Sequence, residues 1–376
     1  MSTPLTDRPV LMTGFPGFLS DRLVQRLAES TSSTLHFLCL EGTAKTARNR
    51  LEQLGDRGVD LDGRWEVHTG DIARPRLGLD SAVYDQLTDD VGIVWHLAAI
   101  YDLSVAEEIA YRINVGGTAN ILDFCEACTD FERLNYVSTC YVAGKRRGTV
   151  REDELDVGQH HHNHYEATKF WAEVEVQRRS QSIPTAIFRP AIVVGDSETG
   201  ETNKYDGPYY VFQLLDRLPE WMPVPAVGSG DARVNLVPVD FVARALAHLG
   251  TDPDADGNVY QLADPNPMTA RQIVDRTLEI LGRRKTMGRL PADWVRRALE
   301  YQTVEEWAGV PAEALTYFNH DVEFDTTHTE RDLADAGIAC PPLPTYLDTL
   351  VGFFLQHPDA PPVTPSTASA TAPGGG

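Results

Sequence analysis

The sequence predicts an α/β fold in which helices cover both faces of a doubly wound parallel sheet, followed by a smaller, mixed C-terminal lobe. Short apolar runs alternate with helical patterns of about 10–15 residues, and this alternation is typical of β–α–β units. A glycine-rich turn between the first run and the first helical pattern supports the same fold. Because crossovers between parallel strands are right-handed, the helices are expected on both faces.

Six strands are expected before residue 195, in the order of the apolar runs. They cover residues 10–13, 35–40, 65–68, 93–98, 134–137 and, on either side of Pro190, 185–188 with 191–194. After Gly195 the sequence becomes rich in Gly, Pro, Asp and Tyr, and the alternation stops. A short strand over 234–239 precedes a helix over 241–249, for which Asp240 is the expected N-cap.

This change of pattern divides the chain into a nucleotide-binding domain and a lobe. The nucleotide-binding domain is expected to comprise 1–195 with 232–257, and the substrate lobe 196–231 with 258–357. Residues 358–376 contain Pro, Ser, Thr, Gly and Ala without an apolar period, which indicates a disordered tail.

The overall composition argues against several classes of function. The chain has 33 cationic and 55 acidic residues and a net charge of −22, which argues against nucleic acid or an anionic membrane as a partner. The 42% of hydrophobic residues is enough for a large core and excludes a wholly disordered chain. The odd number of five cysteines indicates a reducing compartment, and we expect a cytoplasmic protein without a signal peptide or a membrane span.

The first strand ends in a glycine-rich turn that opens the first helix. Gly14 permits the tight turn, and Gly17 lets the backbone approach a pyrophosphate at the positive end of the helix dipole. Ser20 occupies the third small position, where a glycine is usual. The residues expected to hold a dinucleotide here are Thr13, Gly14, Pro16, Gly17, Phe18 and Leu19.

Two carboxylates at the ends of the next strands are expected beside the adenosine. Glu41 follows the second strand, where a carboxylate accepts from the ribose hydroxyls and repels a 2′-phosphate, which favours NAD over NADP. Lys45 and Arg48 lie just beyond and leave NADP possible. Asp71, after the third strand, is placed either to accept from the adenine amino group or to cap its own loop.

A tyrosine and a lysine four residues apart give the strongest catalytic signal. Tyr165 and Lys169 share one face of a helix, and an ammonium beside a phenol is expected to lower the pKa of the tyrosine. Tyr165 would then be a general acid for a carbonyl that is being reduced. Ser138 and Thr139 end the fifth strand, at the same edge of the sheet as the glycine turn.

These segments together resemble the extended short-chain dehydrogenase/reductase superfamily over about the first 250 residues. The matching segments are TGFPGFLS at 13–20, GDI at 70–72, HLAA at 96–99, NVGGT at 114–118, VSTCYVAG at 137–144, YEATK at 165–169 and RPAIVVG at 189–195. The resemblance implies a Rossmann domain with the catalytic residues Thr139 (rather than Ser138), Tyr165 and Lys169. It also implies cofactor contacts by Tyr165 and Lys169, and by Ile72, Leu97, Ala98, Ala99, Pro190 and Ile192.

A narrower resemblance is to the fatty acyl-CoA reductase and thioester reductase branch of these epimerase- and dehydratase-like proteins. It is carried by HTGDIARPRLGL at 68–79, GDSETGETNKYDGPYY at 195–210, VNLVPVDFVARAL at 234–246 and the threonine of VSTCYVAG. It implies NAD(P)H-dependent reduction of an aldehyde or of an acyl thioester, either a fatty acyl-CoA or a carrier-bound one. Side chains that could line the acyl pocket, or instead form lobe core, are Tyr205, Tyr209, Tyr210, Phe212, Trp221 and Met222.

Two other functions stay open at this point. An NDP-sugar epimerase or dehydratase with tightly bound NAD would use the same fold and needs cations in the lobe. The candidate cations are Arg233, Arg283, Arg284 and Lys285. The other possibility is a nucleotide-sensing protein without catalysis, against which the intact Thr139, Tyr165 and Lys169 argue.

The histidine run and a cysteine pair are interpreted as structural. Residues 159–164, QHHHNH, are expected to form a polar loop rather than a metal site, because carbonyl reduction by a tyrosine needs no metal. Cys125 and Cys128 are expected on a buried helix face. Asn114 is expected to order the fourth helix or a water near the lysine, or else to be a helix N-cap. The resemblance also implies a homodimer that pairs through the helix of Tyr165.

Overall fold

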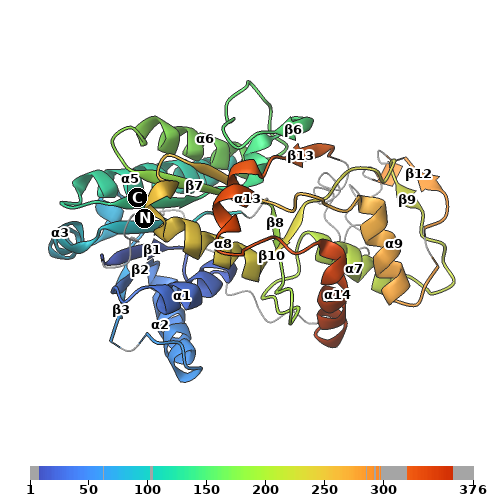
Figure 1. The fold of residues 1–376 in the computed structure, drawn as a ribbon, viewed down its shortest axis with the longest axis horizontal. Helices are drawn as coiled ribbons and strands as arrows, with labels where there is room; N and C mark the ends of the chain where they lie inside the picture. Colours follow the sequence, from blue (N-terminus) through green and yellow to red (C-terminus); the bar gives the residue numbers. More distant parts are fainter. Residues whose placement is uncertain are drawn as a thin grey trace, which may run out of the picture.

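The computed structural model describes residues 8–61, 63–101, 105–284, 286–291, 294, 295, 297 and 320–358. Its centre is a seven-stranded parallel sheet with the order β11-β7-β5-β4-β1-β2-β3 (Figure 1). The strands are β1 (Val10–Thr13), β2 (Leu35–Cys39), β3 (Trp65–Thr69), β4 (Ile93–His96), β5 (Arg133–Val137), β7 (Thr185–Pro190) and β11 (Val259–Leu262). The strand order reverses between β1 and β4, and sheets of this kind bind ligands at the carboxyl ends of such strands.

Helices cover both faces of this sheet. One face carries α1 (Phe18–Ser30), α2 (Glu41–Asp56) and α8 (Val239–Thr251). The other face carries α3 (Ser81–Asp90), α5 (Gly117–Ala127) and α6 (His164–Arg179), with α4 (Glu107–Tyr111) against α6. Met12 and Phe37 pack into the first of these cores, and Leu11 and Leu38 into the second, as in a parallel sheet buried on both faces. The predicted doubly wound parallel sheet is confirmed.

A further core lies beside the sheet, around α7 (Pro208–Arg217), α9 (Ala270–Ile280) and α14 (Leu347–Gln356) (Figure 1). Short parallel pairs accompany it, namely β8 (Ile192–Val194) with β10 (Leu236–Pro238) and β9 (Ala226–Val227) with β12 (Arg289–Leu290). Tyr205, Tyr209 and Phe212 are buried in this core, whereas Trp221 is 81% exposed. For those three aromatic residues the structure therefore favours core packing over a substrate pocket.

The seventh strand changes the expected domain boundary. β11 lies within 258–357, which the sequence analysis assigns to the lobe, yet it pairs with β7 in the central sheet. α13 (Thr327–Ala334) packs against β11, and β13 (Val322–Phe324) pairs with β6 (Gly148–Val150) on the same side. A four-residue strand has no pattern that distinguishes a main sheet from a new one, so its place could not be predicted. The tail expected over 358–376 lies, except for Pro358, outside the described residues.

The start of α8 differs from the expected cap. The helix begins at Val239 with Pro238 as its N-cap, so Asp240 lies within the first turn. The carboxylate of Asp240 accepts hydrogen bonds from the amide and the hydroxyl of Ser197, each at 2.8 Å. A carboxylate in the first turn also suits the helix dipole. Asp240 therefore ties the loop after β8 to α8 instead of capping the helix.

The cysteines and the apolar helices give two further observations. All five cysteines are free thiols, and Cys125 and Cys128 are buried on α5 and at its end, as predicted. None of the described helices combines the length and the apolar character that crossing a bilayer requires.

A buried ion pair fixes α6 to β7. The side chains of Arg189 on β7 and Glu173 on α6 are 1% and 0% exposed, and Nη2 of Arg189 lies 2.6 Å from Oε1 of Glu173. Ser138 donates to the other carboxylate oxygen, and Arg189 also donates to the carbonyls of Glu152 and Glu154 at 3.1 and 3.0 Å. Removing one member of such a pair leaves a buried charge without compensation.

Replacing Glu173 tests this anchor. Glu173→Gln is expected to lower the free energy of unfolding by about 3–5 kcal/mol, because Arg189 would stay buried without a counter-ion. Denaturant unfolding followed by circular dichroism measures the change. The matched control is Glu175→Gln on the same helix, whose exposed pair with Arg178 is worth less than about 1 kcal/mol. Equal effects of the two substitutions would contradict the anchoring role.

Candidate functional site

The glycine turn after β1 lies against the backbone that follows β4. Gly14 has a φ of +85°, and a Cβ there would lie 2.8 Å from the amide nitrogen of Ala98. A Cβ at Gly17 would lie 2.7 Å from the carbonyl oxygen of Gly14. Both positions therefore require glycine. α1 begins at Phe18, so the amides of Phe18 and Leu19 belong to a first helical turn, where amides lack helical partners and attract anions.

Ser20 closes this turn, a role that the sequence analysis missed. Its hydroxyl donates to the carbonyl of Gly14 at 2.9 Å and accepts from the amide of Gly17 at 2.9 Å. Pro16, between the two glycines, follows Phe15 through a cis peptide bond. The contact with Gly17 is one half of a capping box, in which the side chain at the third helical position accepts from the N-cap amide. That position usually holds Glu or Gln, so a serine gave no signal for the contact.

The two carboxylates expected at the adenosine lie at the ends of β2 and β3. Glu41 is exposed and is the first residue of α2. Arg48, further along α2, donates to the carbonyl of Val67 at 2.9 Å, so its guanidinium is already engaged. Oδ1 of Asp71 accepts from the amide of Ala73 at 2.9 Å, which is the loop-capping contact. The exposed Glu41 is thus the carboxylate of the two without a loop-capping role.

A chain of hydrogen bonds starts at the glycine turn and crosses to α5. The amide of Ala98 donates to the hydroxyl of Thr13 at 3.1 Å, and this hydroxyl lies 2.8 Å from Nδ1 of His96. Nε2 of His96 lies 3.0 Å from the hydroxyl of Thr118, which donates to the carbonyl of Asn114 at 2.6 Å. The amide of Ala98 can only donate, and the carbonyl of Asn114 can only accept. Thr13 therefore donates to Nδ1 of His96, and Nε2–H of His96 donates to Thr118. Burial lowers the pKa of His96 to about 3, which keeps the imidazole neutral.

Asn114 connects this chain with α6. Its side chain accepts from the amide of Ile100 at 2.8 Å and donates to the carbonyl of Ile100 at 2.9 Å. It also donates to the hydroxyl of Thr168 at 2.9 Å, and Thr168 donates to the carbonyl of Tyr165 at 3.1 Å. The expected ordering role of Asn114 therefore extends to the helix that carries Tyr165.

The predicted catalytic residues Thr139 and Tyr165 lie near the end of β5. The hydroxyl of Thr139 acts on the pKa of Tyr165, whereas the hydroxyl of Ser138 donates to the carboxylate of Glu173. Burial raises the pKa of Tyr165 to about 12, and the carboxylate of Glu166 also raises it, while Thr139 acts in the opposite direction. The phenol is therefore protonated at neutral pH.

Lys169 binds the end of β5 instead of the phenol. Its Nζ donates to the hydroxyl of Tyr136 at 3.0 Å and to the carbonyl of Val137 at 2.8 Å. Burial lowers the pKa of Lys169 to about 7, and the carboxylate of Glu173 opposes that shift. The prediction that the ammonium lowers the pKa of Tyr165 is wrong in this structure, because burial dominates both groups.

Three polar side chains beside Tyr165 were missed by sequence reasoning. Besides burial, the phenol of Tyr101 and the charge of Asp206 also raise the pKa of Tyr165. Lys204 pairs with Asp206, and its Nζ lies 3.9 Å from the ring centre of Tyr101. These contacts join the segment after β4 to the segment before α7. The motif at 195–210 indicated a substrate-side loop but not which of its residues face Tyr165.

The other expected cofactor residues follow the carboxyl ends of neighbouring strands. Leu97, Ala98 and Ala99 follow β4, Ile72 follows β3, Pro190 ends β7 and Ile192 begins β8. The carbonyl of Pro190 lies 3.4 Å from the hydroxyl of Thr139. Ile72 packs against Gly117, where a Cβ would lie 2.8 Å from its Cδ1. The structure thus brings the predicted residues to one edge of the sheet.

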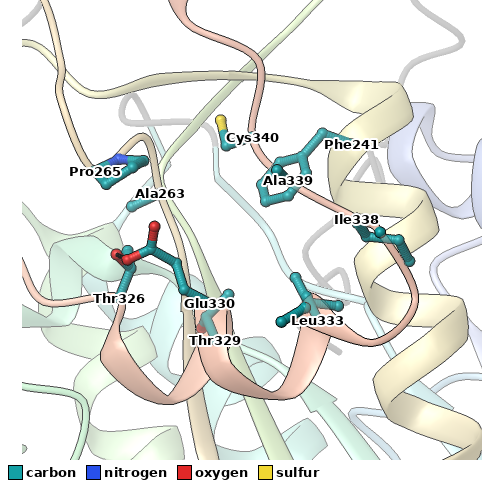
Figure 2. A pocket seen from close by; sticks show the side chains of 12 residues that line it. Phe241, Ala263, Pro265, Thr326, Thr329, Glu330, Leu333, Ile338, Ala339 and Cys340 are labelled. Atoms are coloured by element: carbon teal, nitrogen blue, oxygen red, sulfur yellow. Dashed lines mark hydrogen bonds between the residues drawn. The ribbon is translucent and has the colours of Figure 1, made fainter.

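A cavity of about 320 Å³ lies between α8 and α13 (Figure 2). Its lining is largely apolar and includes Phe241, Leu333 and Cys340, with Glu330 as the charged group. None of the predicted site residues lines it. α8 and α13 pack on the face of the sheet opposite to α6, so the cavity is separate from the surroundings of Tyr165.

The histidine run forms the loop that enters α6. Nδ1 of His162 lies 3.0 Å from the buried carboxylate of Glu166, and the ring of His161 packs against Phe170. Asn163 caps α6, where its side chain accepts from the amide of Glu166 at 2.9 Å. Within the described part of the chain, the side chains of this loop do not gather into a group of three metal ligands.

Comparison with known proteins gives one family match and several relatives. Residues 12–246 match the NAD-binding family model described as male sterility protein. Glycine betaine reductase ATRR of Emericella nidulans is 30% identical over 299 residues, which are 74% of this chain and 22% of that protein. This chain therefore spans about a fifth of that relative's length. The putative fatty acyl-CoA reductase CG8306 of Drosophila melanogaster is 26% identical over 317 residues, which are 69% of this chain and 60% of that protein.

A solved structure is similar over nearly the whole chain. The terminal R domain from the myxalamid PKS-NRPS biosynthetic pathway superposes with a TM-score of 0.81 at 27% identity. The superposition covers 95% of this chain and 93% of that chain.

Asn114→Ala tests the connection between the turn and α6. We expect it to lower the free energy of unfolding by about 1–3 kcal/mol, because the buried amide and carbonyl of Ile100 lose their partner. Denaturant unfolding measures the loss. Asn49→Ala, at an exposed position of α2, is the matched control and should stay within about 0.5 kcal/mol of the parent. A loss no larger than that of the control would show that the bridge is dispensable.

Proposed function

This chain belongs to the NAD-binding family described as male sterility protein, and from that membership we propose that it reduces the carbonyl of an acyl thioester or an aldehyde with hydride from a nicotinamide cofactor. The observation that carries the proposal is that Thr139 lies near the phenol of Tyr165 and lowers its pKa. The pair lies at the carboxyl edge of the sheet that also bears the glycine turn. Relatives named as reductases, among them glycine betaine reductase ATRR, support the reaction type.

The residues present suit a dinucleotide. The turn at Gly14 and Gly17 has no room for side chains, and α1 begins at the residue that follows Gly17. A pyrophosphate would be held there by backbone amides. Glu41 and Asp71 would lie at the adenosine, and we infer a preference for NADH, because Glu41 is exposed and Arg48 is engaged elsewhere.

Tyr165 is proposed as the proton donor, with Thr139 as its partner. A nicotinamide held at this edge would supply hydride to the carbonyl carbon, which would leave negative charge on the carbonyl oxygen. The phenol of Tyr165, protonated at neutral pH, gives its proton to that oxygen, while Thr139 stabilises the phenolate left behind. With a thioester, the carbon–sulfur bond breaks next, the carbonyl re-forms, and the proton leaves with the sulfur as a thiol.

Lys169 is proposed to hold the nicotinamide ribose. In the structure its Nζ lies at the end of β5 beside Val137, at the edge where the ribose would sit. Because the pKa of Lys169 is about 7, only part of its population is protonated at neutral pH. Because Lys169 binds Tyr136 and Val137 rather than Tyr165, we propose that it positions the cofactor and does not make the phenol acidic.

The geometry gives less support to an NDP-sugar epimerase. Arg233, one of the expected pyrophosphate ligands, pairs with Glu323 at 2.6 Å. Arg283 donates to the carbonyl of Leu218 at 2.5 Å. Arg284 is exposed, and Lys285 lies outside the described residues. Two of the candidate cations thus have protein partners.

We also propose that the chain forms a homodimer and works in the cytoplasm. A homodimer through α6 would cover Trp171, which is 49% exposed on that helix, and Tyr111, which is 51% exposed. The five free thiols support a reducing compartment such as the cytoplasm.

A substrate screen tests the function. Purified protein with NADH or NADPH is offered acyl-CoA thioesters, aldehydes and NDP-sugars, and the absorbance of the reduced nicotinamide is followed. We expect loss of that absorbance with thioesters or aldehydes. Tyr165→Phe should lower turnover by about 10²–10⁴-fold and leave cofactor binding nearly unchanged. The control Tyr84→Phe, at a buried tyrosine of α3, should retain activity.

Two outcomes would refute this reading. Epimerisation of an NDP-sugar without net cofactor turnover would favour the rival enzyme. Full activity of Tyr165→Phe would mean that another group donates the proton.

Glu41→Arg tests the cofactor preference. A guanidinium at the start of α2 should attract the 2′-phosphate, and the ratio of kcat/KM for NADPH over NADH should rise by at least about tenfold, equivalent to about 1.4 kcal/mol. Steady-state kinetics with both cofactors measure the ratio. Glu52→Arg, at an exposed position further along the same helix, serves as the control and should leave the ratio unchanged. If the parent already prefers NADPH, the proposed role of Glu41 is incorrect.

A further inference from the structure

Three side chains from two neighbouring strands meet at the open edge of the sheet. They are His36 on β2, and Glu66 and His68 on β3. In the parallel register His36 is level with Glu66, and Leu38 is level with His68, so the three side chains share one face. We propose that His36, Glu66 and His68 bind one zinc ion, at a site separate from the surroundings of Tyr165.

The spacing of the three ligand atoms matches a tetrahedral ion. Nδ1 of His36 lies 3.0 Å from Nε2 of His68. Oε2 of Glu66 lies 3.8 Å from that Nδ1 and 3.6 Å from that Nε2. Zinc bonds of about 2.0–2.1 Å in a tetrahedron put ligand atoms about 3.3–3.4 Å apart. Shifts of a few tenths of an ångström would therefore complete the coordination.

The two imidazoles already face each other through the nitrogens that would bind the metal. In the hydrogen bond between them, one of these two nitrogens carries the hydrogen and therefore has no free lone pair. That ring needs only to take its other tautomer for both lone pairs to face the ion.

The charges around the group also suit a cation. Glu66 supplies one negative charge directly, and the carboxylate of Asp90, at the end of α3, acts on His36. Arg48 is the opposing charge near His68, and it is held by the carbonyl of Val67. The two carboxylates outweigh the one guanidinium.

Three protein ligands leave one position of the tetrahedron open. The side chain of Glu66 is 57% exposed, whereas that of His36 is 5% exposed, so the open position faces solvent. An ion here would join the edge strand β3 to β2. These are the strands that lead to Asp71 and Glu41.

Calorimetric titration of the full chain with zinc chloride, after treatment with a chelator, tests the site. We expect one zinc ion per chain, with a dissociation constant that His68→Asn and Glu66→Gln each raise by at least about tenfold. The side chains of Glu66 and His68 are more exposed than that of His36, so these two variants should fold. Circular dichroism checks the folding. Zinc should also raise the unfolding temperature of the parent but not of His68→Asn.

The histidine run supplies the matched control. His160→Asn combined with His164→Asn removes two exposed histidines and should leave the affinity for zinc unchanged. The proposal is overturned if the parent binds no zinc, if His68→Asn binds it as tightly as the parent, or if the control variant loses binding. In the first case the pair is a hydrogen bond between histidines and nothing more.

Discussion

The neutral imidazole of His96 is the constraint on which the rest of the site depends. It accepts from Thr13 at the glycine turn and donates to Thr118 on α5, and Asn114 continues the path to α6. Because each end of the path is fixed by a backbone group, the hydrogen bonds run in one direction only. A protonated His96 would offer two donors and break the bond from Thr13, and burial prevents this. The turn and α6 are therefore held by one continuous set of contacts.

Burial also decides the protonation of the groups on α6. A general acid must keep its proton until charge develops on the substrate, and the phenol of Tyr165 does so because its pKa lies far above neutrality. Lys169 is different, since its pKa of about 7 lets it change charge in the working range. Its hydrogen bonds to Tyr136 and Val137 show where the ammonium rests in the protein by itself. Tyr165 and Lys169 share one face of the helix, yet their polar groups lie in two different environments.

The sheet and the location of the site could be predicted because apolar periodicity and glycine spacing are local signals. The alternation of strands and helices specified the central sheet, and the turn at Gly14 specified the binding edge. Contacts between distant segments could not be predicted in this way. Lys204 meets Tyr101, and β11 joins β7, only because the chain returns to the sheet after a long excursion. The direction of the pKa shift of Tyr165 depends on burial, which i and i+4 spacing does not report.

Thr13 and His96 stand level with each other on adjacent parallel strands. Side chains alternate between the faces of a strand, so adding or removing a single residue within 10–13 or 93–96 would send one of the two to the wrong face. Loops between the elements, such as 180–184, carry no such restriction. Among relatives of this chain, evolution can therefore vary the lengths of connections freely, whereas these two short segments must keep their residue count.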